Sequence, residues 1–242
     1  MEVSTFLLAS LAVFILGMSK AGLKGLGIIV VAILANVYGA KASTGILLPL
    51  LIVGDVLAVS FYRKYVKWEY LWKFLPAMVV GVLIAVVVGK NLDENAFRSW
   101  MAVIILVSVV ILLWRDLRRK MSFPRNPLFT GSMGILAGFT TMIGNLAGAF
   151  SNIYFLATQL PKNELIATAA WLFFIINLFK VPFHVFSWET ITLESLWIDL
   201  TLIPAAIVGF LLGKKLVTYI SEQNYRWFLL IATTLGALLL FV

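Results

Sequence analysis

Two lysines stand among closely spaced glycines at Ser19–Gly27, which reads Ser-Lys-Ala-Gly-Leu-Lys-Gly-Leu-Gly. Glycine has no Cβ, so another molecule can approach the backbone there closely. Positive side chains beside free backbone N–H groups form a combination that binds small oxyanions. We therefore predict that Lys20, Lys24, Gly25 and Gly27 bind a small anion. Lys24 has a second interpretation, in which its long stem carries the ammonium out to an interface.

A second glycine-containing break interrupts the apolar sequence in the other half of the chain, at Met142–Asn145. Around it, Thr140, Thr141 and Asn145 offer uncharged hydrogen-bond donors, and Gly144 offers exposed backbone. If the two breaks face each other, these residues complete a site for the same small anion. Glycine pairs spaced four apart also let helices pack closely, and we favour packing for Gly134-x-x-x-Gly138 and Gly209-x-x-x-Gly213.

One carboxylate, Asp55, lies inside the otherwise apolar run Ala42–Tyr62. A charged group surrounded by apolar residues is costly and is by default a functional candidate. Two readings stay open. Asp55 carries a coupling proton, or it pairs with a lysine, for which the candidates are Lys20, Lys24 and Lys180.

Several other polar residues lie in or near the apolar runs. Thr44 and Thr168 come early in matching runs, and each hydroxyl either bonds its own helix backbone or faces the site. Asn177 is interpreted as a bridge between helices. Lys180 is expected to reach an interface, and the lone His184 is expected to have no mechanistic role.

The composition indicates the class of protein that must position these residues. Hydrophobic residues make up 62% of the 242 residues and charged residues only 12%, whereas a soluble domain has about 25% charged residues. We therefore predict an all-α polytopic membrane protein. With no cysteine and one histidine, neither disulfides nor a metal centre nor another cofactor is expected. The sequence also lacks an ATP phosphate loop and recognisable catalytic motifs, so we expect no enzyme.

The apolar runs fall into two similar sets, predicted as repeats at 1–120 and 121–242. Each set begins with two short runs, too short to span comfortably and expected to form a broken, re-entrant-like helical hairpin. Three fuller runs, expected to be transmembrane helices, follow in each repeat. The first run lacks preceding positive charge, so it is not read as a removable signal. In order, the runs are Val3–Met18, Ile28–Tyr38, Ala42–Tyr62, Tyr70–Gly89 and Ser99–Trp114, then Pro127–Thr141, Leu146–Thr158, Glu164–Pro182, Leu196–Gly213 and Trp227–Val242.

Loop charge predicts orientation, because lysine and arginine concentrate in cytoplasmic loops. The net charge of +8 is therefore read as topology, not as a nucleic-acid surface. The strongest basic run, Arg115–Arg125, is expected in the cytoplasm. Lys214 and Lys215 fall on the same side only if Pro127–Thr158 is a hairpin that returns to its side of entry. This pattern favours inverted repeats, with both termini outside the cell.

The sequences around both breaks also resemble segments of a known protein family. Ser19–Gly27, Ala137–Gly148 and Leu160–Thr168 are similar, in this order, to signature segments of the TauE/SafE sulfite-exporter family. The resemblance covers essentially the whole chain, although Lys24 interrupts the glycines of the first segment and Asn145-Leu146-Ala147 those of the second. It implies a multi-pass transporter of the bacterial inner membrane.

The resulting hypothesis is secondary transport of a small anion, with sulfite or an organosulfonate as substrate and export favoured. The partners implied are that anion and the lipid bilayer. Proton coupling through Asp55 and a homodimer are kept as open hypotheses. There are two alternatives. One is a passive anion channel, and the other is a membrane enzyme or assembly partner without transport activity.

Overall fold

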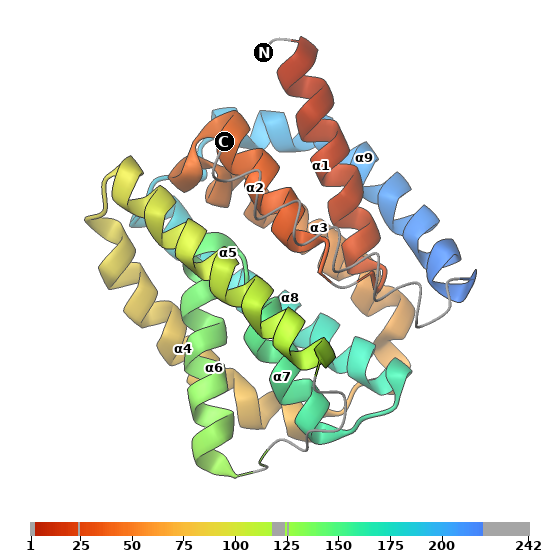
Figure 1. The fold of residues 1–242 in the computed structure, drawn as a ribbon. Coiled ribbons are helices and arrows are strands. Elements are labelled where there is room, and N and C mark those ends of the chain that lie inside the picture. The colour runs from red at the N-terminus through yellow and green to blue at the C-terminus, as the bar shows by residue number, and fades with distance from the viewer. Residues whose placement is uncertain (1–2, 24, 118–123, 125, 220–242) are drawn as a thin grey trace.

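The computed structural model describes residues 3–23, 25–117, 124 and 126–219, and within them all regular structure is helical (Figure 1). The predicted run Trp227–Val242, Lys24 and most of the Arg115–Arg125 run lie outside the described residues. The helices are α1 (Val3–Lys20), α2 (Gly27–Tyr38), α3 (Ala40–Tyr62), the 3₁₀ helix η1 (Arg63–Tyr65), α4 (Trp68–Lys90), α5 (Glu94–Leu117), α6 (Pro127–Gly144), α7 (Gly148–Thr158), α8 (Lys162–Phe186) and α9 (Leu193–Tyr219).

Seven of the described helices are long and apolar enough to cross a membrane: α1, α3 with η1, α4, α5, α6, α8 and α9. The chain is therefore a multi-pass membrane protein. The predicted short lengths are right for α2 and α7, with 12 and 11 residues, but wrong for α1 and α6, with 18 each. Both helices continue beyond their apolar runs. Helix α1 reaches Lys20, which pairs with the buried Asp55. Helix α6 continues to Gly144, after which Asn145 ends it in a left-handed conformation with φ 56°.

Polar groups fix the helix ends that border the breaks and turns. The side chain of Asn126 accepts a 2.7 Å hydrogen bond from Phe129 N at the start of α6. At the turn between α2 and α3, Gly39 has φ +89°. The Glu94 carboxylate of α5 then accepts hydrogen bonds from Ala40 N and Lys41 N, which have no helical partner at the start of α3.

Glycines bring α1 against α9 and α4 against α6, which confirms the packing interpretation of both small-residue pairs. A Cβ added to Gly209 would lie 2.0 Å from the Phe14 carbonyl oxygen, and one on Gly138 would lie 1.9 Å from that of Met78. The backbones therefore touch directly. In each case the first helix of one half packs on the fourth helix of the other half.

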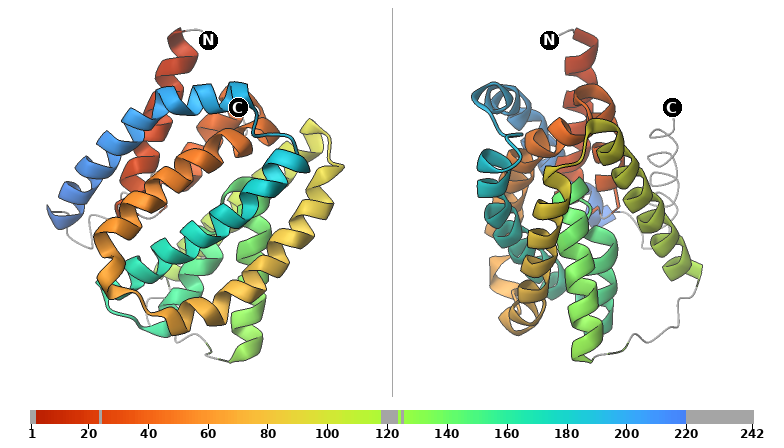
Figure 2. Two further views of the ribbon diagram at one scale, coloured as in Figure 1. Left: turned by 180° about the vertical axis from the view of Figure 1, so that it is seen from behind. Right: turned by 90° about the vertical axis from the view of Figure 1, so that its left-hand side faces the viewer.

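The contacts between α3 and α8 show that these two central helices run antiparallel. Near the end of α3, Lys67 N donates to Thr168 Oγ1 near the start of α8. At the other end, a Cβ on Gly45 would lie 2.2 Å from the Thr190 carbonyl oxygen, just after α8. Figure 2 shows α3 in orange and α8 in teal as two extended neighbours.

One end of the bundle carries five described basic residues, which lie just after α3 and near the end of α9. The helices α1 and α9 run parallel, since Phe14 meets Gly209 and Met18 meets Gly213. Because the end of α1 also lies against the second half of α3, α3 and α9 finish at the same end of the molecule. We call this the basic end; its residues are Arg63, Lys64, Lys67, Lys214 and Lys215. The opposite end contains the loop from Ser187 to Thr192, which has no lysine or arginine.

Candidate functional site

Both helix breaks lie well inside the spanning bundle. A Cβ on Gly54 would lie 2.8 Å from Lys20 Cγ, so the end of α1 is level with Gly54 on α3. The span that contains Gly54 continues to Tyr65, which is about 16 Å further along a helix. The second break meets Lys180, whose Nζ donates to the Thr141 carbonyl oxygen at 2.9 Å and to Asn145 Oδ1 at 2.5 Å. Irregular backbone at this depth must be satisfied by protein groups or face a wet cavity.

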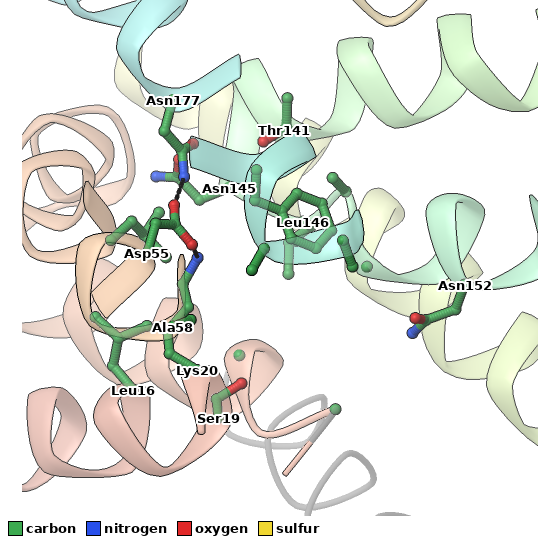
Figure 3. A pocket seen from close by; sticks show the side chains of 18 of the residues that line it. Leu16, Ser19, Lys20, Asp55, Ala58, Thr141, Asn145, Leu146, Asn152 and Asn177 are labelled. Atoms are coloured by element: carbon green, nitrogen blue, oxygen red, sulfur yellow. Dashed lines mark hydrogen bonds and ion pairs between the residues drawn. The ribbon is translucent and has the colours of Figure 1, made fainter. Parts of the chain in front are cut away.

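A pocket of about 170 Å³ lies between the two breaks (Figure 3). Because a water needs roughly 10–15 Å³ measured in this way, several water-sized groups fit. Helices α3, α5 and α8 complete the walls with Leu51, Asp55, Ala58, Ser108, Ile166, Ala169, Ala170, Phe173 and Asn177. The breaks and their flanks contribute Leu16, Ser19, Lys20, Gly22, Gly25, Gly27, Ile28, Thr141, Asn145, Leu146, Ala147, Gly148, Ala149 and Asn152.

Two glycines leave the backbone open at the start of the short helices. Gly27 begins α2 and Gly148 begins α7, and a Cβ added to either one would meet nothing within 4 Å. The preceding residues, Leu26 and Ala147, provide no side-chain cap for the first turns. A ligand in the pocket can therefore approach these helix N-termini, where the helix dipole favours an anion. At α2, the Ile28 and Ile29 N–H groups already donate to the Gly25 and Leu26 carbonyl oxygens, at 3.4 and 3.1 Å.

A chain of polar contacts lines the inner wall of the pocket. Lys20 Nζ donates to Asp55 Oδ1 at 2.5 Å, and Asn177 Nδ2 donates to Asp55 Oδ2 at 2.7 Å. In Figure 3 the three side chains point toward one another from α1, α3 and α8. The side chain of Asp55 is 1% exposed and that of Lys20 is 13% exposed. Of the two open readings of Asp55, the structure shows the lysine pair, with Lys20 as the partner.

Lys180 extends this series of polar contacts further into the protein. The prediction that Lys180 reaches an interface is wrong. The residue is 0% exposed. Its Nζ reaches four oxygens, namely Asn177 Oδ1 at 3.2 Å, Thr141 Oγ1 at 3.3 Å, and the Thr141 carbonyl and Asn145 Oδ1 contacts given above. Packing of α8 against the break after α6 brings these acceptors together. The one sequence signal was the three-residue spacing of Asn177 and Lys180, which places them on one helix face.

Six of the predicted site residues line the pocket: Lys20, Gly25, Gly27, Asp55, Thr141 and Asn145. Lys24 lies outside the described residues. The side chain of Asn145 is held from two directions, because its Oδ1 accepts from Lys180 and its Nδ2 donates to the Thr44 carbonyl oxygen at 3.2 Å. Its amide therefore ties the second break to α3 and α8.

The other four predicted site residues do not line the pocket. The hydroxyls of Thr44 and Thr140 bond carbonyl oxygens of their own helices, at Lys41 and Leu136. Thr168 bonds the Glu164 carbonyl oxygen and accepts from Lys67 N. Gly144 lies beneath the Leu146 side chain.

The pocket also has lining residues that the sequence interpretation did not select. Ser108 of α5 is buried, and its hydroxyl has no hydrogen-bond partner in the part of the chain that the structure describes. The Phe173 ring lies 5.5 Å from Lys20 Nζ, within the range of a cation–π contact. Neither residue stands in a polar motif, so only packing reveals them. Within the described residues, no group of three or more His, Cys, Asp or Glu side chains is placed to hold a metal ion.

Comparison with known proteins gives one match. Residues 7–240 match the family model described as "Sulfite exporter TauE/SafE". No curated protein matches the chain, and no solved structure does. The match includes both breaks and every described residue that lines the pocket.

Proposed function

The chain belongs to the TauE/SafE sulfite-exporter family, a family of membrane transporters and not of enzymes, and we propose that it is a secondary transporter that exports a small anion. Sulfite or an organosulfonate is the proposed substrate. The observation that carries this proposal is the pocket between the breaks, where Lys20 and the open N-termini of α2 and α7 meet. A lysine ammonium and two helix N-termini converging on one cavity suit a small oxyanion.

The proposed architecture is two inverted repeats, at 1–120 and 121–242. The antiparallel run of α3 and α8 supports it, because these helices hold the same place in each half. The exchanged packing of α1 with α9 and of α6 with α4 supports it as well. A binding site formed by broken helices at the repeat interface is a recurring arrangement in secondary transporters.

The proposed orientation places the basic end in the cytoplasm of a bacterial cell and the protein in the inner membrane. The pocket residues Ala58 and Ile166 lie between the Asp55–Asn177 contact and the basic end, judged by their order along α3 and α8. The pocket therefore extends toward the proposed cytoplasmic side. This placement supports loading from the cytoplasm, as export requires.

The proposed coupling uses the contact between Lys20 and Asp55. An arriving anion competes with the Asp55 carboxylate for the Lys20 ammonium, because both are acceptors for the same donor. When Lys20 turns to the substrate, Asp55 is left as a buried carboxylate without its ion-pair partner, which favours taking up a proton on a carboxyl oxygen. Binding of a divalent anion, such as doubly charged sulfite, and binding of a proton would then occur together.

The test is flux of sulfite and of methanesulfonate in proteoliposomes, with and without a proton gradient. We expect saturable flux that follows the gradient and that falls at least about tenfold in Lys20→Met. Lys73→Met is the matched control, since Lys73 is exposed on α4 and pairs with Glu69 at 2.6 Å. Flux that rises linearly with concentration and ignores the gradient would indicate a passive channel. A folded protein without flux of either anion would contradict the transport proposal.

A further inference from the structure

Building on the transport function proposed above, we propose that Lys180 is the second cation of the anion site, and that the charge balance among Lys20, Lys180 and Asp55 selects the charge of the anion that binds. The inference concerns a residue that lies behind the pocket wall and acts through the side chains in front of it. Lys180 is therefore a positioning and specificity-determining residue.

The hydrogen-bond pattern suits the charged form of each group. The Lys180 nitrogen contacts four oxygens, each of which can act as an acceptor. Only an ammonium has three protons to donate to such a set. Both oxygens of Asp55 accept, one from Lys20 and one from Asn177, which is the pattern of an ionised carboxylate.

Lys180 reaches the pocket through two amides. Asn177 accepts from Lys180 and donates to Asp55, and Asn145 accepts from Lys180 at the second break. Both asparagines line the pocket. Since the ammonium is completely buried, its field is screened less than that of a surface lysine and extends to a ligand on the other side of these amides.

The described site therefore contains two cations and one carboxylate. Among the described residues that line the pocket, which do not include Lys24, Lys20 and Asp55 are the charged side chains. His184 lies one turn beyond Lys180 on α8, where its Nδ1 is 2.8 Å from Thr190 Oγ1 and its Nε2 has no hydrogen-bond partner among the described residues. With Asp55 ionised, the three groups leave one positive charge, which matches a monovalent anion. With Asp55 protonated they leave two, which matches a divalent anion.

A purely structural role for Lys180 makes a different prediction. Lys180 bonds the Thr141 carbonyl at the end of α6, so it could serve only to hold the break in place. Its loss would then damage binding whatever the charge of residue 55. If charge balance matters, neutralising Asp55 as well restores one net positive charge and should restore binding of a monovalent anion.

The experiment measures binding of methanesulfonate and of sulfate to the purified full chain by calorimetry at pH 7.5. The variants are Asp55→Asn, Lys180→Gln, the double variant Asp55→Asn/Lys180→Gln, and the exposed control Lys73→Met. Lys180→Gln keeps a hydrogen-bond donor but removes the charge. Thermal unfolding in the same detergent establishes that each variant is folded.

We expect Lys180→Gln to bind methanesulfonate at least about tenfold more weakly, and the double variant to return to within about threefold of wild type. Asp55→Asn should shift the ratio of sulfate to methanesulfonate affinity toward sulfate by at least about tenfold.

If the folded double variant binds methanesulfonate as weakly as Lys180→Gln, or if Asp55→Asn leaves the affinity ratio unchanged, the inference is wrong while the transport function stands. If Lys180→Gln does not fold, the ratio in Asp55→Asn decides alone. A folded wild-type protein that binds neither anion would contradict the proposed function, and this inference with it.

Discussion

At the scale of single residues, the site depends on one buried ion pair and two bare glycine positions. Lys20 and Asp55 come from α1 and α3 and meet at 2.5 Å, with Asp55 almost fully buried. Removing one partner of a buried pair leaves an uncompensated charge, whereas removing both can be nearly neutral. The two glycines, Gly27 and Gly148, contribute by the absence of a side chain.

Lys20→Met is expected to lower the free energy of unfolding by about 3–5 kcal/mol, because it leaves the Asp55 carboxylate buried without its cation. The double variant Lys20→Met/Asp55→Asn should recover most of this stability but not anion binding. Thermal unfolding in detergent measures the first effect and calorimetry with methanesulfonate the second. A double variant as unstable as Lys20→Met would show that the pair does not act as a unit.

Gly27→Ala and Gly148→Ala are each expected to leave the fold intact and to reduce anion flux at least about tenfold. The added methyl group meets no protein atom within 4 Å, and alanine favours a helix more than glycine does. It would instead occupy the space through which a substrate reaches the first-turn N–H groups. Gly131→Ala on α6 is the matched control, since its Cβ also meets open space but Gly131 does not line the pocket. Normal flux in both site variants would remove the helix N-termini from the binding site.

At the scale of helices, close backbone contact fixes how the two halves of the chain interlock. Gly138 of α6 and Gly209 of α9 each face a carbonyl oxygen of the partner helix at a distance that excludes any side chain. Helix association in a bilayer relies on such packing, because lipid is as apolar as the side chains that it replaces. The pocket forms where α2 and α7 begin, between these packed pairs.

Gly138→Ala and Gly209→Ala are expected to destabilise the protein by about 1–3 kcal/mol each, the usual cost of overpacking. The methyl group would overlap the Met78 or Phe14 carbonyl oxygen and force the helices apart. Unfolding of each variant in detergent measures the loss, with Gly131→Ala, in the same helix as Gly138, as the control. Equal stability of all three variants would mean that α4 and α1 can move away without cost.

At the scale of the whole molecule, charge and helix direction together define two distinct ends. The basic end collects Arg63, Lys64 and Lys67 after α3 and Lys214 and Lys215 in α9. Glu189 lies at the opposite end, in the loop from Ser187 to Thr192, and this loop has no lysine or arginine. Lysine and arginine in short loops resist translocation, so the basic end is expected to stay in the cytoplasm.

Single-cysteine labelling can test this orientation cleanly, because the sequence contains no cysteine. Lys64→Cys and Lys215→Cys are expected to react with a membrane-impermeant maleimide only in inside-out vesicles. Arg98→Cys and Glu189→Cys should react only in intact cells. The reverse pattern would mean that the orientation is opposite to the one proposed. Labelling of Lys64→Cys and Lys215→Cys from opposite sides of the membrane, or of Arg98→Cys and Glu189→Cys from opposite sides, would contradict the inverted repeats.

The sequence by itself determined the membrane class, the position of both breaks and four of the first-half residues that line the pocket, namely Lys20, Gly25, Gly27 and Asp55. Apolar run length and scarcity of charge decide whether a segment can lie in lipid, and both are properties of local sequence. Glycines beside Lys20 and a lone acid at position 55 were visible for the same reason, since each stands out against apolar neighbours.

Only the tertiary structure decided which polar groups meet. Asp55 had three candidate lysines, and helix packing selected Lys20. Lys180 had seemed to belong at an interface, yet the break after α6 surrounds its ammonium with oxygen atoms. The hydroxyls of Thr44 and Thr168 had two readings each, and in the structure both bond carbonyl oxygens of their own helices. Partners more than thirty residues apart depend on how helices pack and rotate against each other, and local composition and spacing do not encode that rotation.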